Sequence, residues 1–229
     1  MISRRTLLTM IGTAPLCGAA GFWDKKPSTS WTGDEILQLT TKSPWAKETN
    51  LDFEFAEGGH FEVPGSGSPY GGQDGGGRGA TIERPAGVLK RAPVLVRWES
   101  AQPIRDALLA PLPREFAGHY VLSVLNVPPT AMLPEKRLSP DAPPVSLQSF
   151  LDDLQASATL EAQGQEPAGA GVVRRMTGSE STYLFGFSKE LLPLSAKDKE
   201  VVFTLHTKRV SVKAKFQPKD MLYRGALAI

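Results

Sequence analysis

Apolar and polar residues alternate along several stretches of the chain, and a two-residue period of this kind predicts β-strands. Over residues 51–55, Leu and Phe alternate with Asp and Glu, which predicts a half-buried strand. Over residues 93–99, Val94, Val96 and Trp98 share one face. The remaining predicted strands cover residues 119–126, 158–163, 171–176, 181–187, 200–206, 209–216 and 222–228.

Helix signals interrupt this pattern at three places. Thr32 and Glu35 match a capping box, and the flanking Trp31 and Ile36 have the spacing of a hydrophobic staple. Pro44 then ends this helix or restarts it at a first helical position. Two further helices are predicted from apolar residues on one face: Ile104, Ala107 and Leu108 after a cap at Ser100, and Leu147, Phe150, Leu151 and Leu154 after Ser146.

The order of these elements predicts one α+β domain over residues 31–229, with a mostly antiparallel sheet and two or three short helices. The strand–helix–strand run within 93–126 has the length of a crossover unit, and a hairpin is expected around Thr207-Lys208. Ten of the 23 residues 58–80 are glycine, which predicts a long disordered loop. Six prolines between 127 and 145 predict a second loop.

The first 20 residues have the layout of a signal peptide, followed by a polar tether over 21–30. Arg4 and Arg5 precede an apolar run too short to span a bilayer, which needs roughly 20 residues, and small residues follow. The pair resembles a twin-arginine signal. Chance arginine pairs in general export signals are the alternative. A lipid anchor at Cys17 is a further alternative, although Leu16 fits that motif poorly.

Composition narrows the function classes once this leader is set aside. The leader contains two arginines and no acid, so Lys and Arg fall from 26 to 24 and balance the 24 Asp and Glu. A chain without net charge lacks the basic excess that nucleic-acid binding normally shows. Cys17 is the only cysteine, so cleavage after Ala20 would leave no disulfide and no thiolate metal ligand.

Familiar motifs for catalysis and cofactor binding are missing from the sequence. It contains no Gly-x-Ser-x-Gly elbow and no glycine-rich phosphate loop of either common type. His60, His119 and His206 are scattered without the spacing of metal ligands. We therefore predict neither a metal site nor a cofactor.

One candidate site lies around Arg97, Glu99, Arg105 and Asp106. Arg97 and Glu99 flank Trp98 on its strand, and the helix that follows could bring Arg105 or Asp106 near them. Such a group could bind a polar ligand or perform acid–base chemistry. The alternative is an ordinary pairing of surface charges beside a core tryptophan.

A second candidate is a cationic stripe on the strand 209–216. Arg209, Lys213 and Lys215 share one face with Ser211, and the other face is apolar. This stripe could attract an anionic polymer or an acidic protein. It could equally be the solvated face of a strand, neutralised by acids elsewhere in the chain. Trp23, Trp31 and Trp45 pose a similar choice between a sugar-stacking platform and local packing.

Several short motifs resemble a family of exported bacterial proteins of uncharacterised function. They are Trp31-Thr32-x-x-Glu35-Ile36, Ser43-Pro44-Trp45-Ala46, Val96 through Ala101, Val212 through Phe216, and Lys219-Asp220-Met221-x-Tyr223-x-Gly225. The resemblance implies export and a single shared domain, and it implies no activity, ligand or catalytic residue.

The sequence thus predicts a periplasmic or secreted protein that binds or scaffolds a partner in the cell envelope without catalysis. The expected partner is an anionic envelope polymer or another protein, with neither nucleic acid nor a transmembrane anchor involved. The alternative is an envelope hydrolase with its site at Arg97, Glu99 and Asp106.

Overall fold

The computed structural model describes residues 21–54, 91–128, 131, 146–176 and 182–229. The expected signal peptide, the glycine-rich loop and nearly all of the proline-rich loop lie outside these residues, as do Phe55 and His60. The α-helices are α1 (Phe22–Lys25), α2 (Gly33–Thr41), α3 (Gln102–Leu108) and α4 (Leu147–Ala156), and the 3₁₀-helices are η1 (Ser28–Ser30), η2 (Arg114–Phe116) and η4 (Pro218–Asp220).

The strands follow in chain order, and most agree with the predicted ranges to within two or three residues at each end. They are β1 (Ala46–Phe53), β2 (Arg91–Trp98), β3 (His119–Leu125), β4 (Ala158–Ala162), β5 (Ala168–Gly169), β6 (Val172–Arg175), β7 (Tyr183–Ser188), β8 (Val201–His206), β9 (Val210–Phe216), β10 (Leu222–Tyr223) and β11 (Ala226–Leu227).

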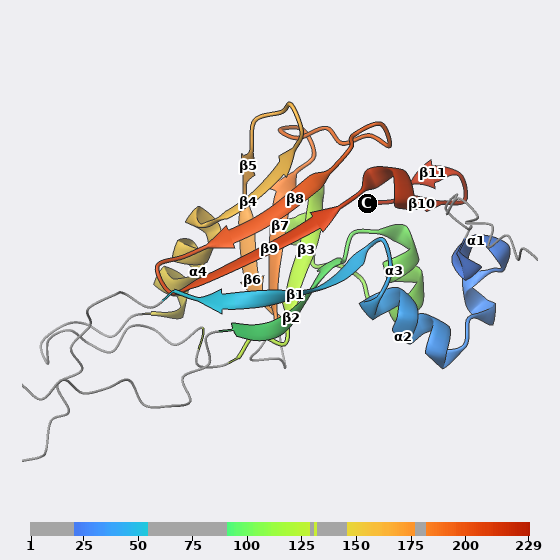
Figure 1. The fold of residues 1–229 in the computed structure, drawn as a ribbon, viewed down its shortest axis with the longest axis horizontal. Coiled ribbons are helices and arrows are strands. Elements are labelled where there is room, and N and C mark those ends of the chain that lie inside the picture. The colour runs from blue at the N-terminus through green and yellow to red at the C-terminus, as the bar shows by residue number, and fades with distance from the viewer. Residues whose placement is uncertain (1–20, 55–90, 129–130, 132–145, 177–181) are drawn as a thin grey trace, which may run out of the picture.

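Nine strands form one curled sheet in the order β5-β4-β8-β9-β1-β2-β3-β7-β6, and every neighbouring pair is antiparallel (Figure 1). The outermost strands β5 and β6 are separated by two residues only. Ala170 N donates to Ala158 O of β4 at 3.0 Å, and Gly171 N donates to Gly186 O of β7 at 2.8 Å. One continuous segment therefore joins the two edges, and the sheet closes on itself.

The expected α+β class is confirmed, but the expected crossover between β2 and β3 is wrong. These strands are antiparallel neighbours, with Leu95 opposite Leu125 and Trp98 opposite Leu122. A crossover helix must return along the whole strand. Seven residues of α3 rise about 10 Å, whereas eight residues of β2 extend about 26 Å. The helix α3 therefore sits at the end of the sheet instead of on its face.

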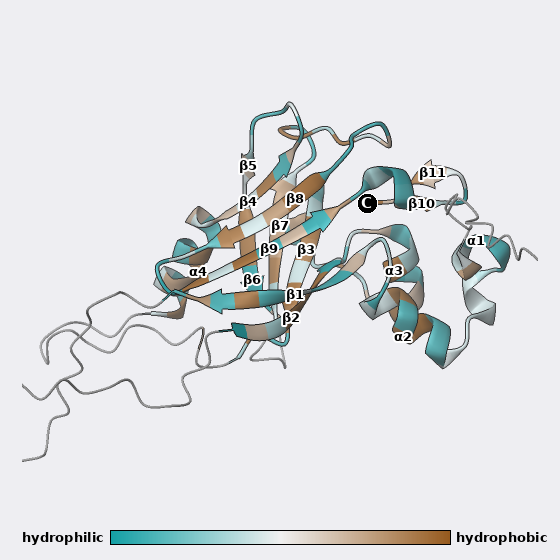
Figure 2. Cartoon of the chain, in the orientation of Figure 1, coloured by the Kyte–Doolittle hydropathy of each residue, from teal (hydrophilic) through white to brown (hydrophobic). Residues whose placement is uncertain are grey.

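Aromatic residues fill the inside of the curled sheet. Trp98 contacts Phe216 edge-to-face at 5.7 Å, and Phe203 contacts Phe185 and Phe187 at 5.5 and 6.1 Å between ring centroids. All five side chains are fully buried. Figure 2 shows the alternation of apolar and polar residues along β8 and β9, where the apolar residues point into this core.

The outer face of β3 and β7 is covered by the segment that contains η2. Phe116 packs there with Val121 and Leu184 in a separate apolar cluster. Gly186 makes this approach possible, because a Cβ at that position would lie 2.8 Å from the Phe116 ring. Both faces of the sheet are therefore buried at this point.

Two predicted helix starts are confirmed and one is wrong. Thr32 Oγ1 accepts from Glu35 N at 3.3 Å, and Glu35 Oε2 accepts from Thr32 N at 2.7 Å, which completes the capping box of α2. Ser146 caps α4. Ser100 caps no helix; its hydroxyl accepts from Val121 N at 3.0 Å instead, and Ala101 takes the cap position of α3.

Two further predicted elements differ in detail. Pro44 restarts no helix, because β1 begins two residues later. The strand expected over 222–228 is divided into β10 and β11 by a turn at Arg224 and Gly225, whose φ angles are +52° and +78°.

Residues 21–30, expected to be a tether, pack against the domain. Phe22 contacts Trp31 at 5.9 Å and Trp23 contacts Trp45 at 5.3 Å, both edge-to-face. Asp24 Oδ1 accepts from Arg224 N at 2.8 Å. The segment looks polar in the sequence, yet its two aromatic residues bind it to the core. We call residues 21–30 the N-terminal brace.

Candidate functional site: a cationic cleft beside α3

Arg97 and Glu99 form a buried ion pair at the end of β2. Arg97 Nε and Nη2 donate to Glu99 Oε1 at 2.9 and 2.7 Å, and only 8% and 6% of the two residues are exposed. Ser123 Oγ donates to the same oxygen at 2.6 Å. The sequence analysis gave pairing of surface charges as the alternative to a site. The two charges do pair with each other, but in the interior and not at the surface.

This pair borders a small hollow of about 210 Å³. Arg174 stands on its rim and is bound to Glu115 of η2. The pKa of Glu115 is lowered by a hydrogen bond to its own backbone N–H and by Arg174. The hollow is also lined by Arg105 and by the apolar side chains of Leu108, Leu112, Met176 and Leu184.

A larger cleft of about 730 Å³ opens on the other side of α3. Its walls come from α3, from the β10–β11 hairpin, from Lys189 after β7 and from Ser28 of the N-terminal brace. Figure 1 shows these elements gathered at one end of the sheet, with the β8–β9 turn at the other end. The polar lining residues are Ser28, Ser100, Gln102, Arg105, Asp106, Lys189, Tyr223 and Arg224.

Three cations line this cleft, and none of them is paired with a carboxylate side chain of the described residues. Arg105, Lys189 and Arg224 form no ion pair with any carboxylate side chain in the part of the chain that the structure describes. Asp106 is the one acidic side chain in the described lining, and its oxygens accept from neutral donors, Gln102 Nε2 at 2.6 Å and Tyr223 OH at 3.0 Å. The cleft therefore has an excess of positive charge.

The titration of Lys189 and Tyr223 reflects this environment. Burial lowers the pKa of Lys189, and the nearby positive charge of Arg105 lowers it further. Lys189 Nζ donates to the main-chain oxygen of Ile229 at 3.1 Å and lies over the Tyr120 ring at 4.9 Å. Burial raises the pKa of Tyr223, and its hydrogen bond to Asp106 adds to the shift. Bringing an anion between Arg105 and Lys189 would relieve their repulsion.

Arg224 is held in the left-handed region of backbone space, at φ +52°. It occupies the first central position of a two-residue hairpin turn, where asparagine, aspartate or glycine is preferred. Its guanidinium lies over the Tyr223 ring at 4.9 Å, and Asp24 satisfies its backbone N–H. An arginine that accepts this backbone cost of about 1 kcal/mol at the cleft points to a use for its charge.

The structure divides the predicted site between two hollows. Arg97 and Glu99 line the small hollow, Asp106 lines the cleft, and Arg105 borders both. The sequence interpretation missed Lys189, Tyr223 and Arg224 as site residues. The one local signal was Gly225, which favours a turn at Arg224-Gly225, but the predicted strand over 222–228 included both residues.

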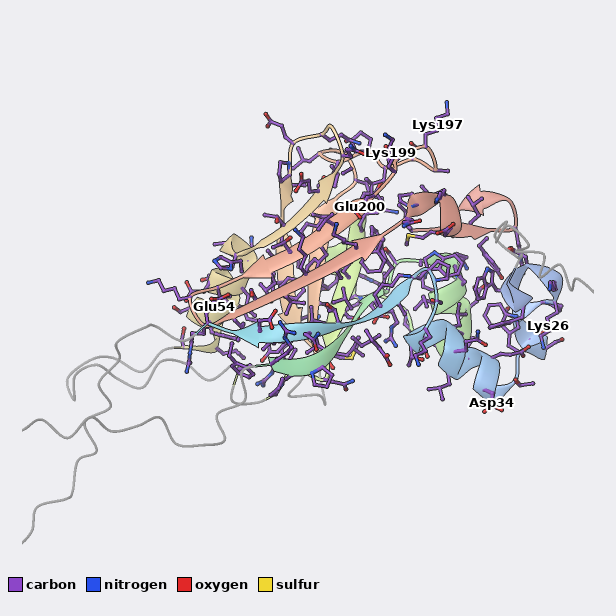
Figure 3. All side chains as sticks on the ribbon, in the orientation of Figure 1. Lys26, Asp34, Glu54, Lys197, Lys199 and Glu200 are labelled. Carbon is purple, nitrogen blue, oxygen red and sulfur yellow. The ribbon has the colours of Figure 1, made fainter. Side chains whose placement is uncertain are left out.

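The predicted cationic stripe lies on the outer face of β9. Lys213 is exposed there, whereas Lys215 Nζ is paired with Glu200 Oε1 at 3.0 Å. Figure 3 shows Glu200 beside the sheet, just before β8 begins. Arg209 also has an interaction partner. Glu200 thus neutralises part of the stripe, at Lys215.

The three tryptophans pack instead of forming a platform. Trp31 and Trp45 are buried, and Trp45 Nε1 donates to Ala228 O at 2.6 Å. Trp23 lies against Trp45 at the base of the N-terminal brace.

The described residues contain no cluster of three or more His, Cys, Asp or Glu side chains arranged to hold a metal ion. None of their helices combines the length and the apolar character needed to cross a membrane. Comparisons with protein-family models, curated proteins and solved structures found no match for this chain.

Proposed function

We infer that this is an exported protein of the cell envelope that binds an anionic ligand in the cleft beside α3 and does not convert it chemically. The observation that carries this proposal is the meeting of Arg105, Lys189 and Arg224 from three separate elements, none with a carboxylate side-chain partner in the described chain.

Physical chemistry supports an anion as the ligand. Like charges brought together without a counter-ion repel one another, and folding tolerates this arrangement only when other interactions outweigh it. The cleft volume of about 730 Å³ falls within the range of small-molecule sites, roughly 300–1,000 Å³. An anionic envelope polymer would fit this cleft better than the cationic stripe on β9, because Lys215 of the stripe is already paired with Glu200.

The geometry gives the alternative hydrolase little support. Glu99 is bound by Arg97 and Ser123, and Asp106 lies in the other hollow. The two carboxylates of the described site therefore do not face a common substrate position, as paired acid–base catalysis requires. The leader sequence of residues 1–20 and the resemblance to exported bacterial proteins support export.

Titration with sodium sulfate, followed by amide NMR shifts at constant ionic strength, tests anion binding directly. Saturable shifts are expected around α3 and the β10–β11 hairpin, and Arg105→Gln should weaken the affinity several-fold. Lys208→Asn is the matched control, because Lys208 is an exposed cation at the β8–β9 turn, at the other end of the sheet. Shifts that never saturate, or that sodium chloride reproduces, would rule out the site.

Fractionation of host cells that carry a tagged chain tests the location. Export is expected for the natural leader, and the double variant Arg4→Lys with Arg5→Lys should abolish export if the twin-arginine route is used. Retention of the natural chain in the cytoplasm would contradict the envelope proposal.

A further inference from the structure

We propose that the ligand of this cleft is an acidic saccharide, in which one anionic group and several neighbouring hydroxyl groups are recognised together. This inference rests on the proposed function and goes beyond it, because the three cations alone would suit any small anion. The additional evidence comes from Asp106 and from the neutral polar groups around it.

The carboxylate of Asp106 would be unfavourable in a site that binds anions alone. A carboxylate beside Arg105 reduces the attraction for any negative ligand. It becomes favourable when the ligand brings hydroxyl donors, since a carboxylate is an acceptor with about four lone-pair positions. Gln102 and Tyr223 use two of these positions and hold the group in place. The remaining positions can accept ligand hydroxyl groups.

Other neutral groups in the lining are suited to hydroxyl recognition. Ser100 Oγ accepts from Val121 N at 3.0 Å, and its own O–H remains a donor. Gln102 contributes an amide carbonyl oxygen, and Ser28 contributes a second hydroxyl group from the N-terminal brace. Cations and hydroxyl-binding groups therefore share one cleft, and a saccharide with an acidic group satisfies both.

The shape and the remaining lining favour a ring-sized ligand over a bare ion. The cleft is much larger than a sulfate or phosphate ion requires. Ala226, Leu227, Ala228 and Ile229 add an apolar side on which the C–H groups of a sugar ring can pack. An acidic peptide is less suitable. Its side-chain carboxylates bring negative charge but no hydroxyl groups that could donate hydrogen bonds to Asp106.

Calorimetric titration of the chain with four probes tests the proposal: digalacturonate, glucose 6-phosphate, sulfate and tetraglutamate. We expect digalacturonate or glucose 6-phosphate to bind about ten-fold more tightly than sulfate and tetraglutamate, because hydroxyl contacts add to the ionic ones. The comparison of the first two distinguishes a carboxylate from a phosphate as the anionic group. Tetraglutamate binding as tightly as the better sugar would overturn the saccharide and favour an acidic peptide.

Asp106→Asn gives a test with opposite expected signs. The variant should bind sulfate more tightly, because a repelling charge is gone. It should bind the better sugar probe several-fold more weakly, because one of the two acceptor oxygens becomes an NH2 donor and the lost hydroxyl contact outweighs the relieved repulsion. Tighter sulfate binding also demonstrates that the variant is folded. Tighter binding of both probes would overturn the saccharide inference and leave anion binding intact, whereas no binding of any probe by the natural chain would overturn the proposed function itself.

Discussion

The Tyr223 hydroxyl donates a hydrogen bond of 3.0 Å to Asp106 Oδ2, and so joins the β10–β11 hairpin to α3 across 117 positions of the chain. This contact joins two of the elements that line the cleft. It fixes Asp106 between two neutral donors and keeps Arg224, the next residue after Tyr223, beside Arg105 and Lys189 in one lining.

Removal of this hydroxyl should loosen the cleft. Tyr223→Phe is expected to lower the free energy of unfolding by about 1 kcal/mol, because a partly buried hydrogen bond to a charged group is lost. Urea denaturation measures the change. In an Asp106→Ala background the same substitution should have almost no effect, and equal effects in both backgrounds would show that the two groups do not interact.

Anion affinity should depend on pH through Lys189. The pKa of Lys189 is lowered from 10.5, the ordinary lysine value, so its ammonium group loses its proton at a lower pH than an ordinary lysine does. As the pH rises, sulfate affinity should therefore begin to fall before 10.5 is reached. Arg105→Gln should raise this pKa, because a repelling charge is removed. NMR titration of the lysine side chain measures the shift, and an unchanged pKa in the variant would contradict the coupling.

The linked effect on stability has a defined sign. Because its pKa is lower in the folded chain than in the unfolded chain, charged Lys189 opposes folding at neutral pH. This unfavourable contribution should decrease as the pH rises from the folded pKa toward 10.5.

Arg224→Asn should separate binding from stability. Asparagine is favoured at positive φ, so relief of backbone strain offsets the lost contact with the Tyr223 ring. The free energy of unfolding should therefore change by less than about 1 kcal/mol. Sulfate affinity should nevertheless fall several-fold. Thermal unfolding and sulfate titration of the same sample measure both, with Lys208→Asn as the charge-matched control. An unchanged affinity would remove Arg224 from the site.

The buried pair of Arg97 and Glu99 should respond asymmetrically to substitution. Arg97→Met alone is expected to cost about 3–5 kcal/mol, because Glu99 is left buried without its charged partner. Replacing both residues, Arg97→Met with Glu99→Leu, should cost less than the single change. Urea denaturation of these two variants and of Glu99→Leu alone measures the coupling, and strictly additive effects would contradict a buried pair.

The N-terminal brace should stabilise the cleft hairpin. Asp24→Ala removes the acceptor for Arg224 N and is expected to lower stability by roughly 1 kcal/mol and to weaken sulfate binding. Lys25→Ala is the control, since Lys25 is exposed on the same short helix. Equal behaviour of the two variants would show that the brace has no influence on the hairpin.

Local signals predicted the elements that depend on neighbouring residues. The capping box at Thr32 and Glu35 formed as expected, because its partners are three residues apart and need nothing else. The β8–β9 hairpin also formed, and Thr207 Oγ1 accepts from Val210 N at 3.0 Å to tighten a turn that lacks glycine. The amphipathic stripe placed α4 correctly.

Long-range pairings were beyond the reach of these signals. Alternation predicts a strand but not its neighbour, so the closure of the sheet through Ala170 and Gly171 could not be foreseen. The N-terminal brace was predicted to be a tether because most of its residues are polar. Its two aromatic residues, Phe22 and Trp23, pack against Trp31 and Trp45, which are buried in the domain.

The sequence by itself determined the periodicity of the strands, the caps of α2 and α4 and the export-like leader, because these are read from residues within a few positions of one another. Only the tertiary structure decided the site. Arg105, Lys189 and Arg224 are separated by 84 and 35 positions and share a cleft because the antiparallel sheet brings the ends of β2, β7 and the final hairpin together. No spacing along the chain encodes this meeting of three cations, because it depends on how distant strands pair.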